Sequence, residues 1–148
     1  MAKKRGRKPT KKRGRKPQKN TRKKTVKRKS PKTKIIHVKS PDELKKYNEH
    51  IDNGKAFVVL YYMDGCPHCE HMKDDWDKFE KHVKRNGSNR LNVARVNARY
   101  LPYIHGHKSV YGFPTISVVR GHHKLGDYNG VERSSDHFKR FYEEVLRS

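Results

Sequence analysis

The sequence predicts an α/β fold, in which a mixed central sheet is flanked by helices and preceded by a disordered basic tail. Of the 148 residues, the first 34 hold 19 lysines and arginines and no acidic residue, whereas the remaining 114 hold 19 basic and 15 acidic residues. In that second segment, continuous apolar runs typical of buried strands alternate with stretches whose apolar residues recur at helical spacing. A segment of about 110 residues can form its own core. We therefore expect a tail over residues 1–34 and one folded domain over residues 35–148.

The folded segment opens with a short predicted strand at residues 35–38. The helix that follows has a clear start, because Ser40 can act as N-cap, Pro41 suits the first position and Glu43 completes a capping box. An Asn-Gly pair at 53–54 ends this helix.

The next strand and helix enclose the most informative part of the chain. Residues 56–62 form a continuous apolar run, which predicts a strand that is buried on both faces. From Cys69 to about Lys84, apolar side chains recur at spacings of four, three and four, which predicts a helix. Its apolar positions are Met72, Trp76, Phe79 and Val83.

The remaining segments complete the alternation. Strands are expected at residues 91–96 and 115–119, with a hairpin partner for the second at 123–128. Ser134 or Ser135 caps a last amphipathic helix. The order is therefore β-α-β-α-β, an irregular stretch, then β-β-α, which is typical of an α/β sandwich with a mixed sheet.

Composition excludes several classes of protein. The sequence contains no apolar stretch of about 20 residues, and it begins with charges instead of the apolar run of a secretory signal. Two cysteines cannot form a scaffold of several disulfides. We therefore expect no membrane partner and no secretion. The expected location is the cytoplasm, the nucleus or a virion assembled there, where a structural disulfide would be unusual.

The basic tail contains an internal repeat. Residues 3–9 and 11–17 share the same seven letters, KKRGRKP, and Val26 is the only sizeable aliphatic residue between Ala2 and Ile35. Such a segment has too little apolar surface to offset the entropy lost on ordering, so we expect it to be disordered.

The repeated Arg-Gly-Arg resembles the AT-hook, a short extended module that binds the minor groove of A·T-rich DNA. Glycine lets the backbone approach the groove floor, and the flanking arginines enter its negative potential. The expected nucleic-acid-binding residues are Arg5, Gly6, Arg7, Arg13, Gly14 and Arg15. Lys8 and Lys16 separate the second arginine of each repeat from its proline, which departs from the usual hook. DNA or RNA binding by phosphate neutralisation is the main interpretation, and a solubilising or nuclear-import segment is the alternative.

The residues most able to carry out a reaction are Cys66-Pro67-His68-Cys69, which lie between the buried strand and its helix. A helix that begins at Cys66 directs its free N–H groups and the positive end of its dipole toward that sulfur, which favours a thiolate. Three residues later, Cys69 lies on the same face and within reach of a disulfide. Pro67 suits the first turn, and a charged His68 adds to thiolate stabilisation. The pattern favours an exposed Cys66 of low pKa and a shielded Cys69, although half of a zinc site has the same spacing.

Together with these cysteines, further motifs give residues 35–148 a clear resemblance to the thioredoxin superfamily. Tyr111-Gly112-Phe113-Pro114-Thr115 resembles the segment that carries the family's cis-proline. The resemblance implies a thioredoxin fold in which Pro114 packs against the cysteine pair and the backbone at Phe113 pairs with the substrate chain. Arg95 stands where the family often has a lysine or arginine, and Trp76 where it has an aromatic residue in the active-site helix.

Two departures concern the immediate surroundings of the cysteines. Gly65 replaces the aromatic residue that the family usually carries before the first cysteine. The intervening pair, Pro67 and His68, is that of the DsbA-type oxidases, whereas thioredoxin has Gly-Pro and protein disulfide isomerase has Gly-His. The resemblance therefore implies a more oxidising couple than that of thioredoxin.

Other departures concern proton transfer and helix shape. Leu60 occupies the place of the acidic residue that the family buries behind the second cysteine, and Asp74 replaces a helix-kinking proline. Asp64 and Glu70 lie nearby in the sequence, but we expect both to be too exposed to replace the buried acid fully. The exchange chemistry is expected to be intact with slow turnover.

Three readings of the cysteine pair remain. The leading one is redox exchange, in which Cys66 is the nucleophile, Cys69 resolves the mixed disulfide, and Pro67, His68, Phe113, Pro114 and Asp64 support the site. A zinc site begun by Cys66, Cys69 and His71 is the second, although a proline stacked on the pair would crowd out further ligands. An inert remnant is the third.

The expected function is that of a protein thiol–disulfide oxidoreductase held on nucleic acid by its tail. We expect a monomer that uses the Cys66–Cys69 disulfide, no other cofactor and no metal, and acts on protein thiols or disulfides. The alternative is a DNA-binding or packaging protein whose thioredoxin-like domain serves only as an interaction module. The combination of a DsbA-like dipeptide and a basic tail also resembles proteins of large DNA viruses that oxidise virion proteins in the cytoplasm.

Overall fold

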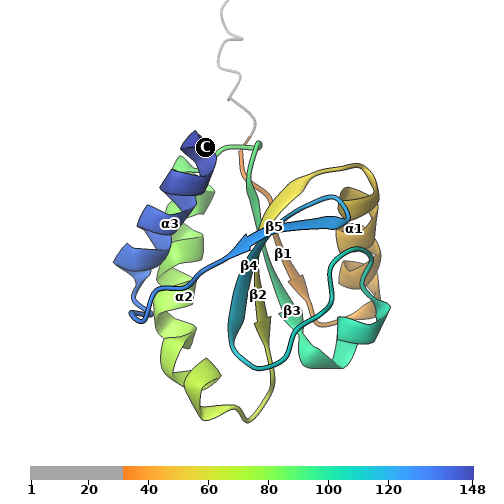
Figure 1. Ribbon diagram of the computed structural model, residues 1–148, viewed down its shortest axis with the longest axis horizontal. Coiled ribbons are helices and arrows are strands. Elements are labelled where there is room, and N and C mark those ends of the chain that lie inside the picture. Colours follow the sequence, from red (N-terminus) through yellow and green to blue (C-terminus); the bar gives the residue numbers. More distant parts are fainter. Residues whose placement is uncertain (1–31) are drawn as a thin grey trace, which may run out of the picture. The chain divides into compact units, whose positions relative to one another are not determined.

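A computed structural model describes residues 32–148, which form a five-stranded mixed sheet flanked by helices (Figure 1). The strands are β1 (Ile35–Val38), β2 (Ala56–Tyr62), β3 (Asn92–Asn97), β4 (Thr115–Arg120) and β5 (His123–Asp127). Their order across the sheet is β1-β3-β2-β4-β5. Strands β1, β3 and β2 are parallel, and β4 and β5 run antiparallel. The predicted fold class is confirmed.

The helices cover both faces of this sheet. They are α1 (Pro41–Asp52), α2 (Pro67–Asn86) and α3 (Ser135–Arg147), with a 3-10 helix, η3 (Ala98–Tyr103), after β3. Helices α2 and α3 lie together on one face, and α1 lies on the other (Figure 1). The 3-10 helix falls in the stretch that the sequence left irregular. Helix α2 continues two residues past the predicted end at Lys84, to Asn86.

Strand β2 lies at the centre of the sheet, and its side chains alternate between two apolar layers. Val58 and Leu60 pack with α2 and α3, whereas Phe57, Val59 and Tyr61 pack with α1. Alternate residues of a strand face opposite sides of the sheet. Because both sides are covered by helices, successive residues of β2 are all apolar. The continuous run at 56–62 therefore reflects double-sided burial, as predicted.

Aromatic side chains join α2 to α3 beneath the sheet. The ring of Trp76 lies 4.9 Å from that of Phe79 and 5.2 Å from that of Phe138, measured between centroids. All three side chains are buried. Aromatic pairs at these distances stabilise a core beyond the effect of burial alone. They therefore stabilise the packing of α2, the helix that carries Cys69, against α3.

Both predicted helix starts have their caps. The Ser40 hydroxyl accepts the Glu43 N–H at 3.4 Å, as the sequence predicted for the N-cap. The Glu43 carboxylate accepts from the Ser40 hydroxyl and not from the Ser40 N–H, so the second hydrogen bond of the expected capping box is replaced by a contact between side chains. At α3, Ser134 and not Ser135 is the N-cap, and it accepts the His137 N–H at 3.3 Å.

The folded domain begins slightly before the boundary expected from composition. The hydroxyl of buried Thr33 donates to the Leu91 carbonyl at 2.7 Å, and the Lys34 N–H donates to the Asn92 side chain at 2.8 Å. Residues 32–34 are therefore part of the packed structure. The rest of the expected tail, including both Arg-Gly-Arg segments, lies outside the described residues. Within residues 32–148, no helix has the length and apolar character needed to cross a membrane.

Candidate active site

The two cysteines lie where β2 ends and α2 begins, at the lower end of the view in Figure 1. Asp64 and Gly65 form the connection, and Gly65 has a φ of 78°, a conformation that strains any residue with a Cβ. This backbone conformation gives a physical reason for a glycine at position 65. Cys66 is the N-cap of α2, and Pro67 follows in the first turn.

The Cys66 sulfur receives hydrogen bonds from the start of α2. The Cys69 N–H donates to Cys66 Sγ at 3.3 Å, and the Cys66 thiol faces the Phe113 carbonyl at 3.6 Å. A hydrogen bond from the Cys69 thiol, together with the backbone N–H groups of Cys69 and His68, lowers the pKa of Cys66. These donors stabilise the thiolate more than the thiol.

The surroundings of Cys69 act in the opposite direction. Burial, together with its hydrogen bond to Cys66, raises the pKa of Cys69 to about 11. Exposure does not distinguish the two residues, because Cys66 is 7% exposed and Cys69 8%. Cys66 is thus less accessible than the sequence suggested, since the loop at Phe113 lies against it. The two sulfurs differ in their acidity.

The loop opposite the cysteines contains the expected proline. The peptide bond between Phe113 and Pro114 is cis, as the resemblance implied. Next to it, the Thr115 hydroxyl donates to the Gly112 carbonyl at 2.7 Å, which holds the turn before β4. The structure thus brings the Phe113 carbonyl to Cys66 from 47 residues away in the chain.

Asp64 lies at a cavity of about 340 Å³ that Cys69 also lines. The Asn97 side-chain amide donates to the Asp64 carboxylate at 3.1 Å, and the Arg99 guanidinium lies 4.0 Å from the same oxygen. Leu60 and Glu70 contribute to the same cavity. Asp64 is exposed, as expected, but the cavity places it on a wall shared with Cys69.

Leu60 is buried, and its neighbour in the sheet is Arg95, so a charged residue stands beside the place where the family buries an acid. Arg95 turns to α2, where its guanidinium donates two hydrogen bonds to Glu80, at 2.8 and 2.9 Å. Glu80 also accepts from His37 at 2.8 Å and from the Trp76 indole at 2.9 Å. The buried carboxylate of this domain is therefore Glu80, which sequence reasoning missed.

Arg133 is a second residue that the sequence did not single out. It lines a cavity of about 300 Å³ beside the first turns of α2, together with His68, His71, Met72 and Val131. After the hydrogen bonds already described, its positive charge also lowers the pKa of Cys66, and it acts in the same sense on Cys69. The loop that carries Arg133 has no helical or strand periodicity, so only the fold reveals its position.

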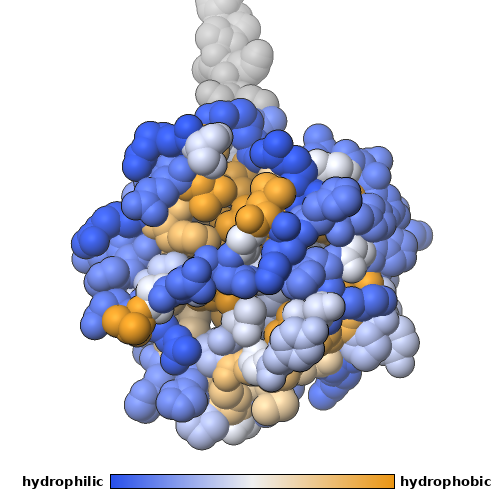
Figure 2. Space-filling view, viewed as in Figure 1, coloured by the Kyte–Doolittle hydropathy of each residue, from blue (hydrophilic) through white to orange (hydrophobic). Residues whose placement is uncertain are grey.

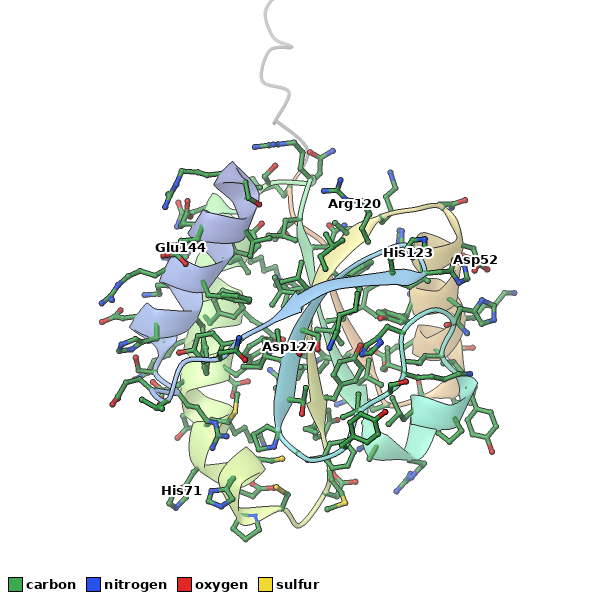
Figure 3. The ribbon with its side chains drawn as sticks, viewed as in Figure 1. Asp52, His71, Arg120, His123, Asp127 and Glu144 are labelled. Atoms are coloured by element: carbon green, nitrogen blue, oxygen red, sulfur yellow. The ribbon has the colours of Figure 1, made fainter. Side chains whose placement is uncertain are left out.

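The structure also bears on the zinc alternative. His71 projects from the first turns of α2 (Figure 3). Among residues 32–148, no group of three or more histidine, cysteine, aspartate or glutamate side chains is arranged to hold a metal ion.

Comparison with known proteins identifies a family and several relatives of this chain. The family model described as Thioredoxin matches residues 38–144. Human protein disulfide-isomerase A6 is 26% identical over 86 residues, which cover 58% of this chain and 20% of that protein. Mouse DnaJ homolog subfamily C member 10 is 26% identical over 106 residues, covering 72% of this chain and 13% of that protein. The chain thus spans about a fifth or less of the length of these relatives.

Solved structures show the same fold. The J-Trx1 fragment of ERdj5 superposes with a TM-score of 0.60 at 26% identity, over 77% of this chain and 52% of that one. The zinc-bound form of human ERp44 superposes with a TM-score of 0.57 at 17% identity, over 75% of this chain and 31% of that one. The second likeness concerns the fold alone.

Proposed function

Because the chain belongs to the thioredoxin family, we propose that it catalyses thiol–disulfide exchange on protein substrates through Cys66 and Cys69. The observation that carries the proposal is the position of Cys66 at the N-cap of α2, where its sulfur accepts the Cys69 N–H at 3.3 Å and lies opposite the carbonyl of Phe113, next to the cis-proline. In agreement with this geometry, hydrogen bonds lower the pKa of Cys66, and burial raises that of Cys69 to about 11. Relatives named as protein disulfide-isomerases support this class of reaction. The redox-active disulfide between the two cysteines is the only cofactor proposed.

The proposed reaction proceeds in two exchanges. The Cys66 thiolate attacks one sulfur of a substrate disulfide, so a mixed disulfide forms and the other substrate sulfur leaves as a thiolate that takes up a proton. Cys69 then loses its proton and attacks the Cys66 sulfur, which releases the second substrate thiolate. The substrate gains two electrons, and the protein ends with a Cys66–Cys69 disulfide. In reverse, the same steps oxidise a substrate dithiol.

Exposed apolar side chains near the cysteines support a protein substrate. Met63 precedes the cysteine turn, Tyr111 precedes the cis-proline, and Val131 adjoins Arg133; all three are exposed. Exposed apolar side chains of this kind are typical of surfaces that bind other proteins. The Phe113 carbonyl accepts from the Cys66 thiol, so a chain bound along this loop would lie next to the reactive sulfur.

The first prediction tests the acidity of Cys66 in the unmodified protein. Timed alkylation with iodoacetamide, followed by peptide mass spectrometry, should modify Cys66 with a midpoint below the ordinary thiol pKa of about 8.5. Cys69 should react only near its pKa of about 11. Arg133→Gln should move the Cys66 midpoint upward, whereas Arg140→Gln, at an exposed position on α3, should not.

Equal reactivity of the two cysteines, or a Cys66 midpoint at or above 8.5, would favour the alternative function. In that case the domain acts as an interaction module of a DNA-binding or packaging protein, and the cysteines are a remnant.

The second prediction concerns the missing acid at residue 60. Leu60→Glu should speed resolution of the mixed disulfide by roughly 10²-fold, because a carboxylate at the cavity beside Cys69 can accept its proton. Leu60→Gln is the matched control, since it has the same length and cannot titrate. Single-turnover kinetics measures the resolution step directly. If both variants fold and resolve at the wild-type rate, Asp64 and water already suffice for the proton transfer.

We further propose that the basic segment binds DNA or RNA. Residues 1–31 contain 17 lysines and arginines and no acidic residue, which provides a dense surface for phosphate contacts and counterion release. The two Arg-Gly-Arg repeats support a preference for narrow A·T-rich grooves. A compartment that contains nucleic acid, such as the cytoplasm, the nucleus or a virion, follows from this proposal.

The third prediction tests that segment. A chain that begins at Lys32, so that the Thr33 contact is kept, should lose most duplex affinity and retain the alkylation profile of Cys66. Full-length binding should fall by roughly 10³–10⁵ between 50 and 200 mM salt if about 6–10 phosphates are contacted. Replacing Arg5, Arg7, Arg13 and Arg15 with lysine should remove any A·T preference at constant charge. Unchanged duplex affinity after truncation would rule this role out.

A further inference from the structure

A second hollow lies at the end of the sheet where β2 begins, which is the end farthest from the cysteines. Its volume is about 450 Å³, and its apolar lining includes Leu91, Leu125, Val145 and Leu146. Leu125 is 59% exposed although it is a large aliphatic residue within a strand. Figure 2 shows an apolar patch in the upper half of this face, bordered by hydrophilic residues.

The border of this hollow is positively charged. Lys55, Arg90 and Arg120 contribute to its lining, and Figure 3 shows Arg120 at the same upper end of the domain. No aspartate or glutamate of residues 32–148 lines the hollow, and none of the three cations forms a salt bridge within that part of the chain. An apolar floor with free cations around it is complementary to an apolar ligand that carries negative charge.

Hydrogen bonds hold the walls of the hollow in place. The Leu91 carbonyl accepts from the Tyr142 hydroxyl at 2.6 Å and from the Thr33 hydroxyl at 2.7 Å. On the other side, the Gly121 N–H donates to the Lys55 carbonyl at 2.9 Å. Because internal hydrogen bonds hold these walls, a binding partner meets a preformed surface, which lowers the entropic cost of association.

Charge disfavours two candidate occupants of the hollow. The basic segment before Lys32 carries 17 positive charges and only one sizeable aliphatic residue, Val26, so it is repelled by the border and cannot fill the floor. A second copy of the chain is disfavoured by a net charge of +23 on each molecule. An acidic segment of another protein that also carries apolar side chains matches both the floor and the border of the hollow.

We propose that this hollow docks a segment of a partner protein in which leucine-sized apolar side chains alternate with aspartate or glutamate. The apolar side chains lie against Leu125, Val145 and Leu146, and the carboxylates pair with Arg90 and Arg120. Guanidinium groups suit this role because they bind carboxylates through two parallel hydrogen bonds.

A partner bound at this hollow would not cover Cys66. The hollow includes Ala56, at the start of β2, whereas Cys66 follows the end of that seven-residue strand. At about 3.3 Å per residue, the two ends of β2 are roughly 20 Å apart. A partner held here therefore leaves Cys66 accessible, and its binding does not depend on thiol exchange.

The test uses a library of random dodecapeptides selected on the full-length protein. Counter-selection uses the triple variant Arg90→Ala, Arg120→Ala and Leu125→Ala, in which the basic segment is intact, so peptides that bind only the tail are removed. Selected peptides should combine aspartate or glutamate with leucine, isoleucine or phenylalanine. They should bind the triple variant at least tenfold more weakly than the wild type. A variant with Lys45→Ala and Tyr103→Ala, two exposed residues outside the hollow, should bind as the wild type does.

A charge-reversal variant distinguishes loss of the binding site from loss of folding, because an unfolded protein would not gain a new peptide preference. Arg90→Glu with Arg120→Glu should reverse the preference toward basic apolar peptides while the alkylation profile of Cys66 is unchanged. The proposal is overturned if no selected peptide distinguishes the triple variant from the wild type. It is also overturned if Arg90 and Arg120 affect duplex DNA binding instead of peptide binding, or if Leu125→Ala abolishes a concentration-dependent dimer.

Discussion

Replacing Cys66 with serine is expected to reduce disulfide exchange to the uncatalysed rate, whereas replacing Cys69 with serine should preserve the first exchange and block the second. The difference follows from the lowered pKa of Cys66 and the raised pKa of Cys69, since only the thiolate attacks a disulfide. A serine hydroxyl at position 69 can still donate a hydrogen bond to Cys66 Sγ, so this variant retains part of what stabilises the thiolate.

The measurement is the formation of a mixed disulfide with a labelled peptide that contains one disulfide, followed on non-reducing gels. Because the chain has only two cysteines, any adduct of the Cys69→Ser protein must be at Cys66. The double serine variant provides the background. The Cys69→Ser protein should accumulate the adduct, and the Cys66→Ser protein should form almost none. Equal adduct formation by the two single variants would contradict the assigned roles.

Local sequence signals predicted the elements that position this site. Three of these signals depend on residues that are close in the chain: the apolar run of β2, the N-cap at Ser40, and the strand-to-helix turn at Cys66. The cis-proline at residue 114 was expected only from the resemblance to a family, because composition and periodicity do not reveal the isomer.

The features that sequence reasoning missed depend on contacts between distant segments. The absence of an acid at Leu60 was visible, but the partner of Arg95 was not, because Glu80 reaches it across the packing of α2 on β3. Arg133 approaches the cysteines from a loop without periodicity. The hollow near Leu125 is formed by several separate elements. The contacts of a polar or charged residue with distant segments become visible only in the folded structure.

Replacing Glu80 with alanine is expected to lower the free energy of unfolding by about 3–5 kcal/mol, the usual effect of removing one member of a buried ion pair. Glu80 is buried, and its loss leaves the Arg95 guanidinium without its main counter-ion and the Trp76 N–H without an acceptor. The neighbouring Asp77 also pairs with Arg95, but it is 40% exposed. Asp77→Asn should therefore cost less than about 1 kcal/mol, and it serves as the matched control.

The same carboxylate should make stability depend on pH. Burial alone would raise the pKa of Glu80, but hydrogen bonds from Arg95 and His37 outweigh it, so the pKa is lowered in the folded protein. A carboxyl with a lower pKa when folded stabilises the protein above its unfolded pKa, which is about 4.3, and this contribution is lost as pH falls through the folded value. Urea unfolding at pH 7 and at decreasing acid pH should show a steeper loss for the wild type than for Glu80→Gln. Parallel pH profiles for these two proteins, or similar losses for Glu80→Ala and Asp77→Asn, would mean that Glu80 does not anchor α2 to β1 and β3.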